Sequence, residues 1–554
     1  MADDVSGRDV LLDVLRSEGV RHIFGNPGST ELPLVDALAG ADDLAYVLAL
    51  QEATVVGMAD GYAQATGRPA FVNLHTSAGL GNAIGNLTNA RANGAPLVVT
   101  AGQQDERHLA ADPLLSGPLV DLASATVKWA HEVRSLGELG TLLRRAFVDA
   151  SKPPPGPVFL SLRMDLLERS GDRADVGPPA RSTVIVDGIA GGLETLADLL
   201  CEPAVGRVAL VAGDEVAAAG AQAELAAVAD ALGAPVFGAP LHSRAVFDPR
   251  HPLWAGMLVP SAAAIRARLE EFDRVLLVGG QAFLVYPYSD GPPLAEGTEL
   301  LHLSPDATPL SRAHPTRLAV AGGVRPSLSA LLPLVAARAD AGAAGDARSA
   351  AASARSTEIE ELETTARDRY GPAPLHPMAA AHALVRAIPD GTAVVDEAIT
   401  TGVYVRGFHH RAVEDGYFFC KGGGLGWGMP AACGVALARD REPVLCVVGD
   451  GSAMYSPQAL WTAARERLPV VFAVVDNGQY RILKDYLRGM GGVSATTGRF
   501  VAMDLEPRVD FLQLASSMSV PATAVDQAAD VADAVAAAFD AGGPHLLHVP
   551  ISAP

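Results

Sequence analysis

Two polar turns, each placed directly after an apolar run, carry the most specific chemistry in the sequence. The run Val444–Val448 leads into the letters GDGS, and the run Val470–Val475 leads into DNGQY. If these runs are neighbouring parallel strands, the Asp450 carboxylate and the Asn477 amide lie side by side at one sheet edge, with the Gln479 carbonyl as a third oxygen. Oxygen ligands of this kind suit Mg²⁺, and glycines before a helix N-terminus favour a diphosphate. The pattern predicts a phosphate–metal site; the alternative is two unrelated strand-end turns.

Three polar residues nearer the N-terminus also follow strand-like runs. Glu52 opens a helix inside an otherwise apolar stretch, where loss of water favours proton exchange by a carboxyl group; the alternative is that it complements the helix dipole. His75 ends a strand, where an imidazole can act as acid or base, or can be a hydrogen-bonded structural residue. Ser29 lies in GNPGST before a helix, so N-capping is favoured there over substrate binding.

A glycine pattern in the same region offers a competing prediction. Residues 79–85 spell GLGNAIG, and Asp105 follows about 20 residues later, which is similar to a dinucleotide-binding fingerprint for NAD(P). Residues 75–78 separate the preceding strand from these glycines, so the turn is not the tight one that a pyrophosphate needs. Close helix–strand packing is the favoured explanation. A second glycine-rich run, 422–428, is expected to form a wall against a flat ligand.

Short apolar runs alternate with amphipathic stretches along most of the chain. This alternation is typical of βαβ units, in which helices cover both faces of a parallel sheet. We therefore predict an α/β fold with three doubly wound parallel-sheet domains, at residues 1–178, 182–335 and 371–554. Residues 336–370 begin with an Ala/Gly/Ser/Asp/Arg tract and are expected to form a surface linker, partly helical because it is rich in alanine.

The first and third of these domains resemble each other in sequence. In each, a Gly-Met dipeptide opens a helix and two later prolines each precede a strand. The prolines are Pro69 and Pro96 in the first domain and Pro443 and Pro469 in the third, at intervals of 27 and 26 residues. Several matches in the same order predict two copies of one fold on either side of a different middle domain.

Composition limits the kinds of partner. The chain has 554 residues, 42 basic and 63 acidic, for a formal charge of −21, which disfavours nucleic acid and acidic membranes as partners. Four cysteines without CxxC spacing argue against a disulfide framework and a cysteine-based zinc site. The N-terminus has no signal-like pattern, and no apolar stretch is long enough to span a bilayer. We expect a cytoplasmic protein that acts on small molecules.

Several stretches together resemble the thiamine-diphosphate-dependent 2-keto acid decarboxylases, most closely the benzoylformate decarboxylases. They include FGNPGSTELP, LALQEATVVGMADGYAQATGRPAF, YFFCKGGGLGWGMPAA, VVGDGSAMYSPQALWTAA and DNGQY. The resemblance implies a pyrimidine-binding (PYR) first domain, a diphosphate-binding (PP) third domain, a homodimer at minimum and usually a homotetramer. It implies thiamine diphosphate and Mg²⁺ as cofactors, with Asp450, Asn477 and the Gln479 carbonyl as metal ligands. Further implied cofactor contacts come from Glu52, Thr400, Gly423, Leu425, Gly451, Ser452 and Tyr480.

The same resemblance implies the reaction, the non-oxidative decarboxylation of an aromatic or branched 2-keto acid to an aldehyde. Glu52 is its implied proton partner for the cofactor, and Ser29 and His75 match residues that bind the substrate carboxylate and transfer protons. The implied pocket residues are Leu114, Leu115, Phe419, Leu483 and Tyr486. Tyr286 stands where these enzymes carry a second catalytic histidine, and because a phenol is the weaker acid we expect slower protonation of the intermediate and more carboligation.

Three other functions remain open on the sequence. An acyloin-forming or acyloin-cleaving carboligase or lyase would use the same cofactor. A less favoured alternative is an NAD(P) oxidoreductase that uses the 79–85 glycines. The third is a catalytically silent binding protein, against which the presence of Glu52 speaks.

Overall fold

The computed structural model describes residues 4–173, 181, 187–202, 206–281, 283–411 and 416–553. These fall into two compact units, one formed by Met1–Val184, Tyr370–Val403 and Gly422–Pro554, the other by Ile185–Arg369 and Tyr404–Lys421. The first and third predicted domains therefore lie in one unit. The predicted boundary between residues 178 and 182 lies outside the described residues, and the individual domain limits stay predictions.

The first sheet lies in the N-terminal part of the larger unit. It is six-stranded, with the order β3-β2-β4-β5-β7-β6 and parallel pairing throughout. Its strands are β2 (His22–Gly25), β3 (Ala45–Leu48), β4 (Ala70–Leu74), β5 (Leu97–Gln103), β6 (Ala130–Val133) and β7 (Val158–Arg163). A separate antiparallel pair joins β1 (Asp4–Ser6) to β8 (Ser170–Asp172).

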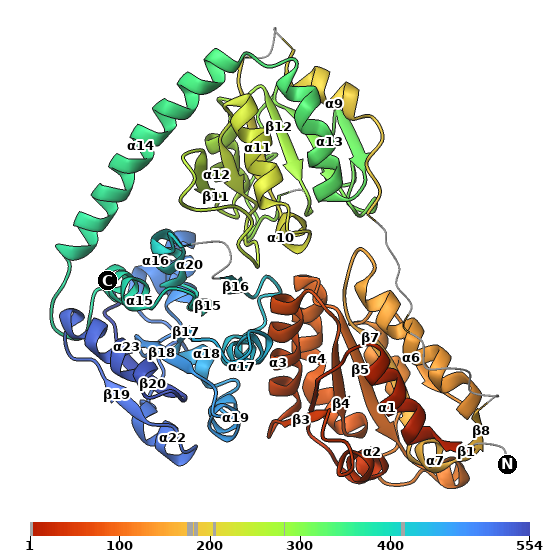
Figure 1. The fold of residues 1–554 in the computed structure, drawn as a ribbon. Coiled ribbons are helices and arrows are strands. Elements are labelled where there is room, and N and C mark those ends of the chain that lie inside the picture. Colours follow the sequence, from red (N-terminus) through yellow and green to blue (C-terminus); the bar gives the residue numbers. More distant parts are fainter. Residues whose placement is uncertain are drawn as a thin grey trace. The chain divides into compact units, whose positions relative to one another are not determined.

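Helices cover both faces of this sheet (Figure 1). The main ones are α1 (Gly7–Ser17), α2 (Leu32–Leu38), α3 (Glu52–Thr66), α4 (Thr76–Asn93), α5 (Leu119–Ser124), α6 (Leu136–Ser151) and α7 (Met164–Glu168). One apolar cluster joins α1 and α6 to alternate sheet residues such as Ile23, Phe71 and Leu160. The start of α1 follows from its capping box, in which Ser6 and Asp9 bond each other's backbone N–H.

The third sheet repeats the strand path of the first. Five of its strands run in the order β15-β17-β18-β20-β19, which matches β2-β4-β5-β7-β6 position by position. They are β15 (Ala393–Glu397), β17 (Val444–Gly449), β18 (Val470–Asp476), β19 (Ala522–Ala524) and β20 (His545–Pro550). The accompanying helices are α15 (Pro377–Ala387), α17 (Gly428–Ala438), α18 (Asp450–Ala453), α19 (Ala459–Glu466), α20 (Arg481–Met490), α21 (Val493–Thr497), α22 (Phe511–Ser517) and α23 (Val531–Asp540). The shared path supports the predicted internal repeat.

Helices α3 and α17 pack closely against each other and join the two repeats into one unit. A Cβ at Gly434 would lie 1.9 Å from the Met58 carbonyl oxygen, and one at Gly61 would lie 2.3 Å from that of Ala431. Only glycine allows the two backbones to approach this far. The glycines of GMADG and CGVA therefore have a packing role.

The central sheet belongs to the smaller unit and follows a different path, β11-β10-β9-β12-β13-β14. Its strands are β9 (Val208–Ala212), β10 (Val236–Gly238), β11 (Trp254–Met257), β12 (Arg274–Val278), β13 (Glu299–Ser304) and β14 (Leu318–Ala321). Helices α9 (Leu193–Leu200), α11 (Gln222–Leu232) and α13 (Val324–Ala336) cover one face, and α12 (Ala262–Leu269) covers the other. The short helix α10 (Asp214–Ala218) follows β9 directly. With the third sheet, which is also six-stranded, the predicted set of three parallel-sheet domains is confirmed.

The segment expected as a linker is mostly one helix, α14 (Ala341–Arg367), of 27 residues (Figure 1). Within it Ala344 and Ala366 are the buried residues, so it is a largely exposed helix, more regular than the partly helical connection that we expected. The smaller unit also contains α16 (Gly402–Phe408) in large part and β16 (Tyr417–Phe419). Across the described residues, no helix is both long and apolar enough to cross a membrane.

Candidate active site

The predicted juxtaposition of the GDGS and DNGQY turns is present in the structure. Strands β17 and β18 pair in parallel, with Gly449 opposite Val475, so Asp450 and Asn477 leave neighbouring strands at the same edge. The Gly478 backbone N–H donates to Asp450 Oδ2 at 2.8 Å, and the Gln479 N–H donates to Asn477 Oδ1 at 3.0 Å. These bonds tie both side chains to one turn.

A pocket opens at this edge of the third sheet. It is lined by most of the residues that the resemblance assigned to the cofactor and metal, namely Thr400, Leu425, Asp450, Gly451, Ser452, Asn477, Gln479 and Tyr480. Gly423 is not among the residues that line it, although its φ of +73° shows that the strap before Leu425 needs a glycine there. The pocket combines an acidic oxygen, an amide oxygen and glycine backbone, a set that fits a metal diphosphate.

A second carboxylate, that of Asp476, lies beside Asp450 and was not anticipated from the sequence. Burial and this neighbour raise the pKa of Asp450 to about 7. Although burial opposes it, hydrogen bonds from His548 and Arg508 hold the pKa of Asp476 below its usual range. Two close carboxylates disfavour simultaneous ionisation unless a cation is present, so the donor set fits a divalent metal at Asp450.

The described residues contain no cluster of three or more His, Cys, Asp or Glu side chains able to hold a metal ion. The expected Mg²⁺ site does not depend on such a cluster, because it uses one carboxylate, one amide oxygen and one backbone carbonyl. Coordination that keeps several water and phosphate oxygens is usual for Mg²⁺. The two observations are therefore compatible.

Another buried carboxylate, Glu397, holds the glycine-rich strap of residues 422–428. Its Oε1 accepts the N–H groups of Gly426 and Trp427, and its Oε2 accepts that of Gly428. Burial raises the pKa of Glu397 to about 7. The sequence reasoning overlooked this residue, yet Glu397 ends strand β15, and the strand-end rule that selected Asp450 would have selected it as well.

Glu52 lies at the corresponding edge of the first sheet. It is the first residue of α3 and is 7% exposed. Asn26 donates to its Oε1 at 3.0 Å and Asn82 to its Oε2 at 2.9 Å, so the carboxylate is held by two amide donors that we did not predict. Glu52 is not among the residues lining the Asp450 pocket of the same chain.

His75 and Ser29 follow the adjacent strands β4 and β2. His75 Nδ1 lies 2.8 Å from Oε2 of Glu31, a buried carboxylate that the sequence reasoning missed. The expectation that Ser29 caps a helix is wrong: Gly28 occupies the N-cap position, and Ser29 is an exposed first residue of the short 3₁₀ helix Ser29–Glu31. The Ser29 side chain is thus not engaged as a cap.

The glycines of residues 79–85 do not form a dinucleotide-binding turn. Helix α4 begins at Thr76, so these glycines lie inside the helix. A Cβ at Gly79 would come within 3.0 Å of Glu52 Oε1, and Asp105 is engaged by Arg107. A Cβ at Gly81 or Gly85 would meet no atom within 4 Å, so the predicted helix–strand packing of this run is wrong, and Gly79 alone is closely packed, against a side chain of helix α3. The predicted NAD(P) fingerprint is not formed either.

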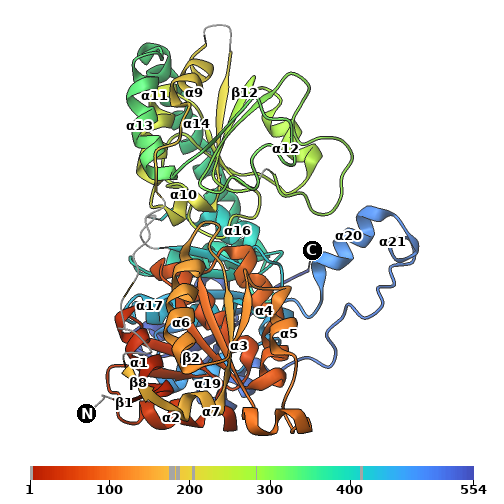
Figure 2. The same cartoon turned by 90° about the vertical axis from the view of Figure 1, so that its right-hand side faces the viewer.

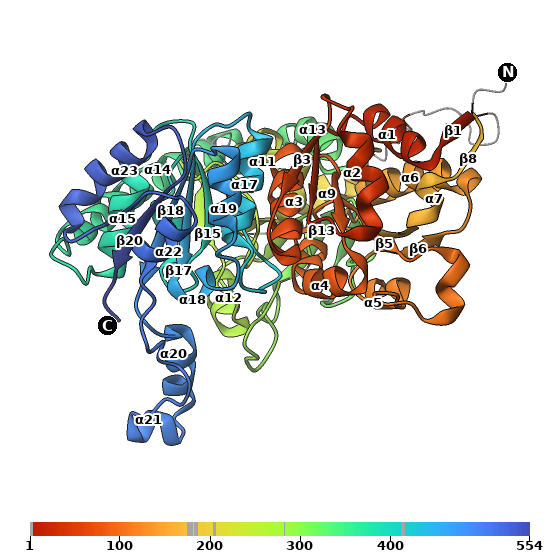
Figure 3. The ribbon, with the colours of Figure 1, turned by 90° about the horizontal axis from the view of Figure 1, so that it is seen from below.

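The implied substrate residues belong to both units of the structure. Leu114 is 84% exposed and Leu115 has a positive φ of 68° in the same loop. Leu483 and Tyr486 lie on α20, which with α21 projects from the third domain (Figures 2 and 3). In the smaller unit, Tyr286 is 65% exposed and Phe419 lies under the Arg406 guanidinium. Their role in substrate binding stays a prediction.

Comparison with known proteins identifies the class to which this fold and site belong. Models of the thiamine pyrophosphate enzymes match the N-terminal TPP binding domain at residues 5–122, the central domain at 193–331 and the C-terminal TPP binding domain at 402–549. The chain therefore belongs to the thiamine-diphosphate-dependent enzymes.

Individual relatives show which thiamine-diphosphate-dependent enzymes the chain resembles. The chain is 35% identical to a benzoylformate decarboxylase of Pseudomonas aeruginosa over 97% of both chains. It is 32% identical to a putative acetolactate synthase large subunit of Mycobacterium tuberculosis, over 98% of this chain and 99% of the relative. Among solved structures, a 4-hydroxybenzoylformate decarboxylase of Rhodococcus jostii RHA1 matches with a TM-score of 0.87, 31% identity and 99% coverage of both chains. The resemblance to 2-keto acid decarboxylases seen in the motifs is confirmed.

Proposed function

We propose that the protein catalyses the non-oxidative decarboxylation of an aromatic or branched 2-keto acid, with benzoylformate-like compounds preferred, to the corresponding aldehyde. The observation that carries this proposal is the pocket that unites Thr400, Leu425, Asp450, Asn477 and Tyr480 at the edge of the third sheet. The names of the benzoylformate and 4-hydroxybenzoylformate decarboxylase relatives support the aromatic substrate class.

Thiamine diphosphate, when bound, supplies a carbon nucleophile and then an acceptor for the electrons released with carbon dioxide. In our proposal Asp450, Asn477 and the Gln479 carbonyl hold Mg²⁺, and Gly451 and Ser452 lie against the diphosphate. Leu425 presents an apolar side chain on the pocket wall, and Glu397 keeps the strap that carries it in place.

The first domain supplies the proton chemistry. Glu52, held by Asn26 and Asn82, exchanges a proton with the pyrimidine end of the cofactor. Ser29 donates a hydrogen bond to the substrate carboxylate, and His75 transfers a proton to or from the reacting carbon or oxygen. Because they follow the neighbouring strands β2, β3 and β4, these three residues share one sheet edge.

We infer a homodimer as the smallest active form, and a homotetramer as its assembly. Within one chain Glu52 does not line the Asp450 pocket, yet the proposed chemistry needs both beside the same cofactor. A second subunit would supply the missing partner. Sedimentation of the loaded enzyme, together with recovery of activity when Glu52→Gln and Asp450→Asn chains are mixed, tests this inference.

A second candidate function is acyloin formation or cleavage on the same cofactor, which the acetolactate synthase relative favours. The two are separated by supplying a panel of 2-keto acids with thiamine diphosphate and Mg²⁺, first alone and then with an added aldehyde. Aldehyde as the main product from the keto acid alone supports the decarboxylase. If the keto acid alone gives mainly a coupled product from two keto acid molecules, or is consumed only after an acceptor aldehyde is added, the carboligase is the correct function.

A further inference from the structure

Glu31 is the most completely hydrogen-bonded side chain near the proposed proton-transfer site. It is 2% exposed. Its Oε1 accepts the Thr30 hydroxyl at 2.7 Å and the Gly102 backbone N–H at 3.0 Å. Its Oε2 accepts the Gly28 N–H at 2.9 Å and lies 2.8 Å from His75 Nδ1. Four donor groups thus surround one carboxylate.

This arrangement determines which nitrogen of His75 carries a proton. Two of the four groups are backbone amides, which can only donate. The Thr30 hydroxyl lies 2.7 Å from Glu31 Oε1 and 3.2 Å from His75 Nδ1, so we assign its hydrogen to the shorter contact with Glu31. As a carboxylate, Glu31 has two acceptor oxygens and no hydrogen to give. The short contact with His75 therefore requires the hydrogen to lie on Nδ1.

We propose that Glu31 is a positioning residue that keeps the proton of His75 on Nδ1 and so leaves Nε2 as the nitrogen that exchanges protons with the substrate. The inference rests on the proposed function for the role of His75, but the tautomer itself does not. The His75 side chain is 21% exposed, and the structure gives Nε2 no hydrogen-bond partner among the described residues. Nε2 is accordingly the free end of the ring.

The surrounding backbone holds the Glu31 and His75 side chains in position. A Cβ at Gly102 would lie 2.1 Å from Glu31 Oε1, and one at Gly28 would lie 2.2 Å from His75 Nδ1. Both side chains are therefore pressed against glycine backbone, and larger residues at either position would displace them. Since Gly28 also donates to Glu31, the same carboxylate fixes the loop that carries Ser29.

The decisive variant is Glu31→Gln, which has the same shape but reverses one hydrogen-bonding role. The glutamine amide group can donate to Nδ1, which then becomes an acceptor and moves the proton to Nε2. We expect kcat to fall by about 10²- to 10⁴-fold with little change in KM, since an imidazole in the wrong tautomer loses a comparable factor in hydrolytic triads. Glu31→Asp, which keeps an acceptor carboxylate, should retain more of kcat than Glu31→Gln.

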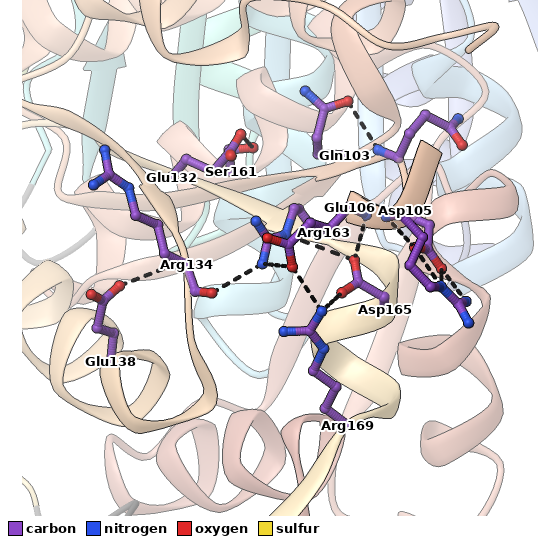
Figure 4. A network of polar contacts seen from close by, with 12 residues as sticks. Gln103, Asp105, Glu106, Glu132, Arg134, Glu138, Ser161, Arg163, Asp165 and Arg169 are labelled. Atoms are coloured by element: carbon purple, nitrogen blue, oxygen red, sulfur yellow. Dashed lines mark hydrogen bonds and ion pairs between the residues drawn. The ribbon is translucent and has the colours of Figure 1, made fainter. Parts of the chain in front are cut away.

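A matched control is available in the same domain. Asp165 is also a buried carboxylate, accepts the Glu106 N–H at 3.1 Å and pairs with Arg169 at 2.8 Å (Figure 4). It has no hydrogen bond to Glu31 or His75. Asp165→Asn should lower thermal stability and leave kcat near the wild-type value, so a kcat loss confined to Glu31→Gln cannot be assigned to a general loss of buried charge.

The tautomer can be observed without activity by ¹⁵N NMR of the histidine-labelled full-length protein, with His75→Gln used to assign the His75 signals. We expect a protonated Nδ1 in the wild type and a protonated Nε2 in Glu31→Gln. A protonated Nε2 in the wild type, or a wild-type kcat in Glu31→Gln, would overturn the proposal. If instead the wild type consumes no 2-keto acid, the proposed function fails, while the NMR result still decides the role of Glu31.

Discussion

The indole Nε1–H of Trp427 donates to Asp60 Oδ2 at 2.8 Å, although the two residues are 367 positions apart in the chain. Both side chains are fully buried. Asp60 also accepts Gln64 and Asn93 amide groups at 2.8 and 2.9 Å. A buried, hydrogen-bonded polar cluster thus lies at the packing of α3 against α17, where the first and third sequence blocks meet. Such clusters specify how two apolar surfaces align.

Trp427→Phe tests how much the hydrogen bond between Trp427 and Asp60 contributes to the free energy of unfolding. The substitution removes one donor and leaves Asp60 Oδ2 buried with one partner fewer, so we expect the free energy of unfolding to fall by about 1–3 kcal/mol. Urea unfolding followed by circular dichroism measures the change. Trp461→Phe is the control, because Trp461 is only half-buried and stacks with Arg465. Equal losses in both variants would contradict the prediction.

Asp450→Asn should weaken binding of thiamine diphosphate in the presence of Mg²⁺ by at least about 100-fold, because loss even of a residue that supports a metal ligand costs 10- to 100-fold. Calorimetric titration of the cofactor measures this, and a chelator should have a similar effect on the wild type. Asp533→Asn in the same domain, an exposed acid on α23, should bind normally. Undiminished cofactor affinity in Asp450→Asn would remove Asp450 from the metal site.

Glu52→Gln should lower kcat by about 10²- to 10⁴-fold, the usual contribution of a positioned acid or base. Cofactor binding should change little, since the diphosphate pocket belongs to the third domain. Steady-state kinetics and cofactor titration of the same preparation separate the two effects. Glu132→Gln, which alters a half-buried glutamate bonded to Ser161, provides the comparison. Wild-type turnover in Glu52→Gln would show that its proton is not used.

We predict that Tyr286, which stands where the similar decarboxylases carry a second catalytic histidine, affects which product leaves. A phenol is a weaker acid than an imidazolium, so protonation of the intermediate should be slow and a second aldehyde should be attacked more often. We expect acyloin from benzoylformate with excess aldehyde, and a several-fold lower acyloin-to-aldehyde ratio in Tyr286→His. Chromatography of both products gives the ratio. The absence of acyloin with the wild type would contradict the predicted role of Tyr286.

The central domain should lose stability in mild acid. Burial, and after it the charge of Arg406, lower the pKa of His242 to about 3, with Arg406 Nη1 3.0 Å from Nε2. Between about pH 6.5 and 3 the unfolded chain therefore binds one more proton at this site, and the free energy of unfolding falls by up to about 1.4 kcal/mol per pH unit as pH decreases. At pH 7 and above His242 is neutral in both the folded and the unfolded chain, so this loss of stability is absent.

His242→Asn checks the assignment. The variant should be less stable at every pH but should show a shallower decline between pH 7 and 5, because one titrating group is gone. Urea midpoints at several pH values provide the comparison. An unchanged slope would mean that other groups determine the acid sensitivity.

The strand-level architecture was accessible from the sequence because it depends on local patterns. Apolar runs such as 444–448 and 470–475 became the parallel neighbours β17 and β18, and the paired prolines marked a repeat that the sheet orders support. The strand-end rule then located Asp450, Asn477, Glu52 and His75. Each of these lies at the C-terminal edge of a sheet, as expected for ligand sites in such folds.

The supporting residues were not accessible in the same way. The strand-end rule could have selected Glu397 and Asp476 as positions, because they end β15 and β18. The partners that define what Glu31, Asp476 and Glu397 do lie far away in the chain, among them Gly102, His548 and Gly426. Their roles arise from tertiary proximity, which no local spacing encodes. For Ser29 the local pattern predicted a role that the structure does not show. Serine has a high preference for the N-cap position, but Gly28 occupies that position and donates its N–H to Glu31.

Because the first and third domains share one strand path, their functional residues can be compared at equivalent strand ends. The second strand of the shared five-strand path, β4 in one copy and β17 in the other, is followed by His75 in the first domain and by Asp450 in the third. Equivalent loops thus carry an imidazole in one copy and, in the other, the acid that we propose binds the metal, on backbones that follow one route. A duplicated framework can specialise through its loops alone, and an active centre assembled from both copies needs no change in the sheets that support it.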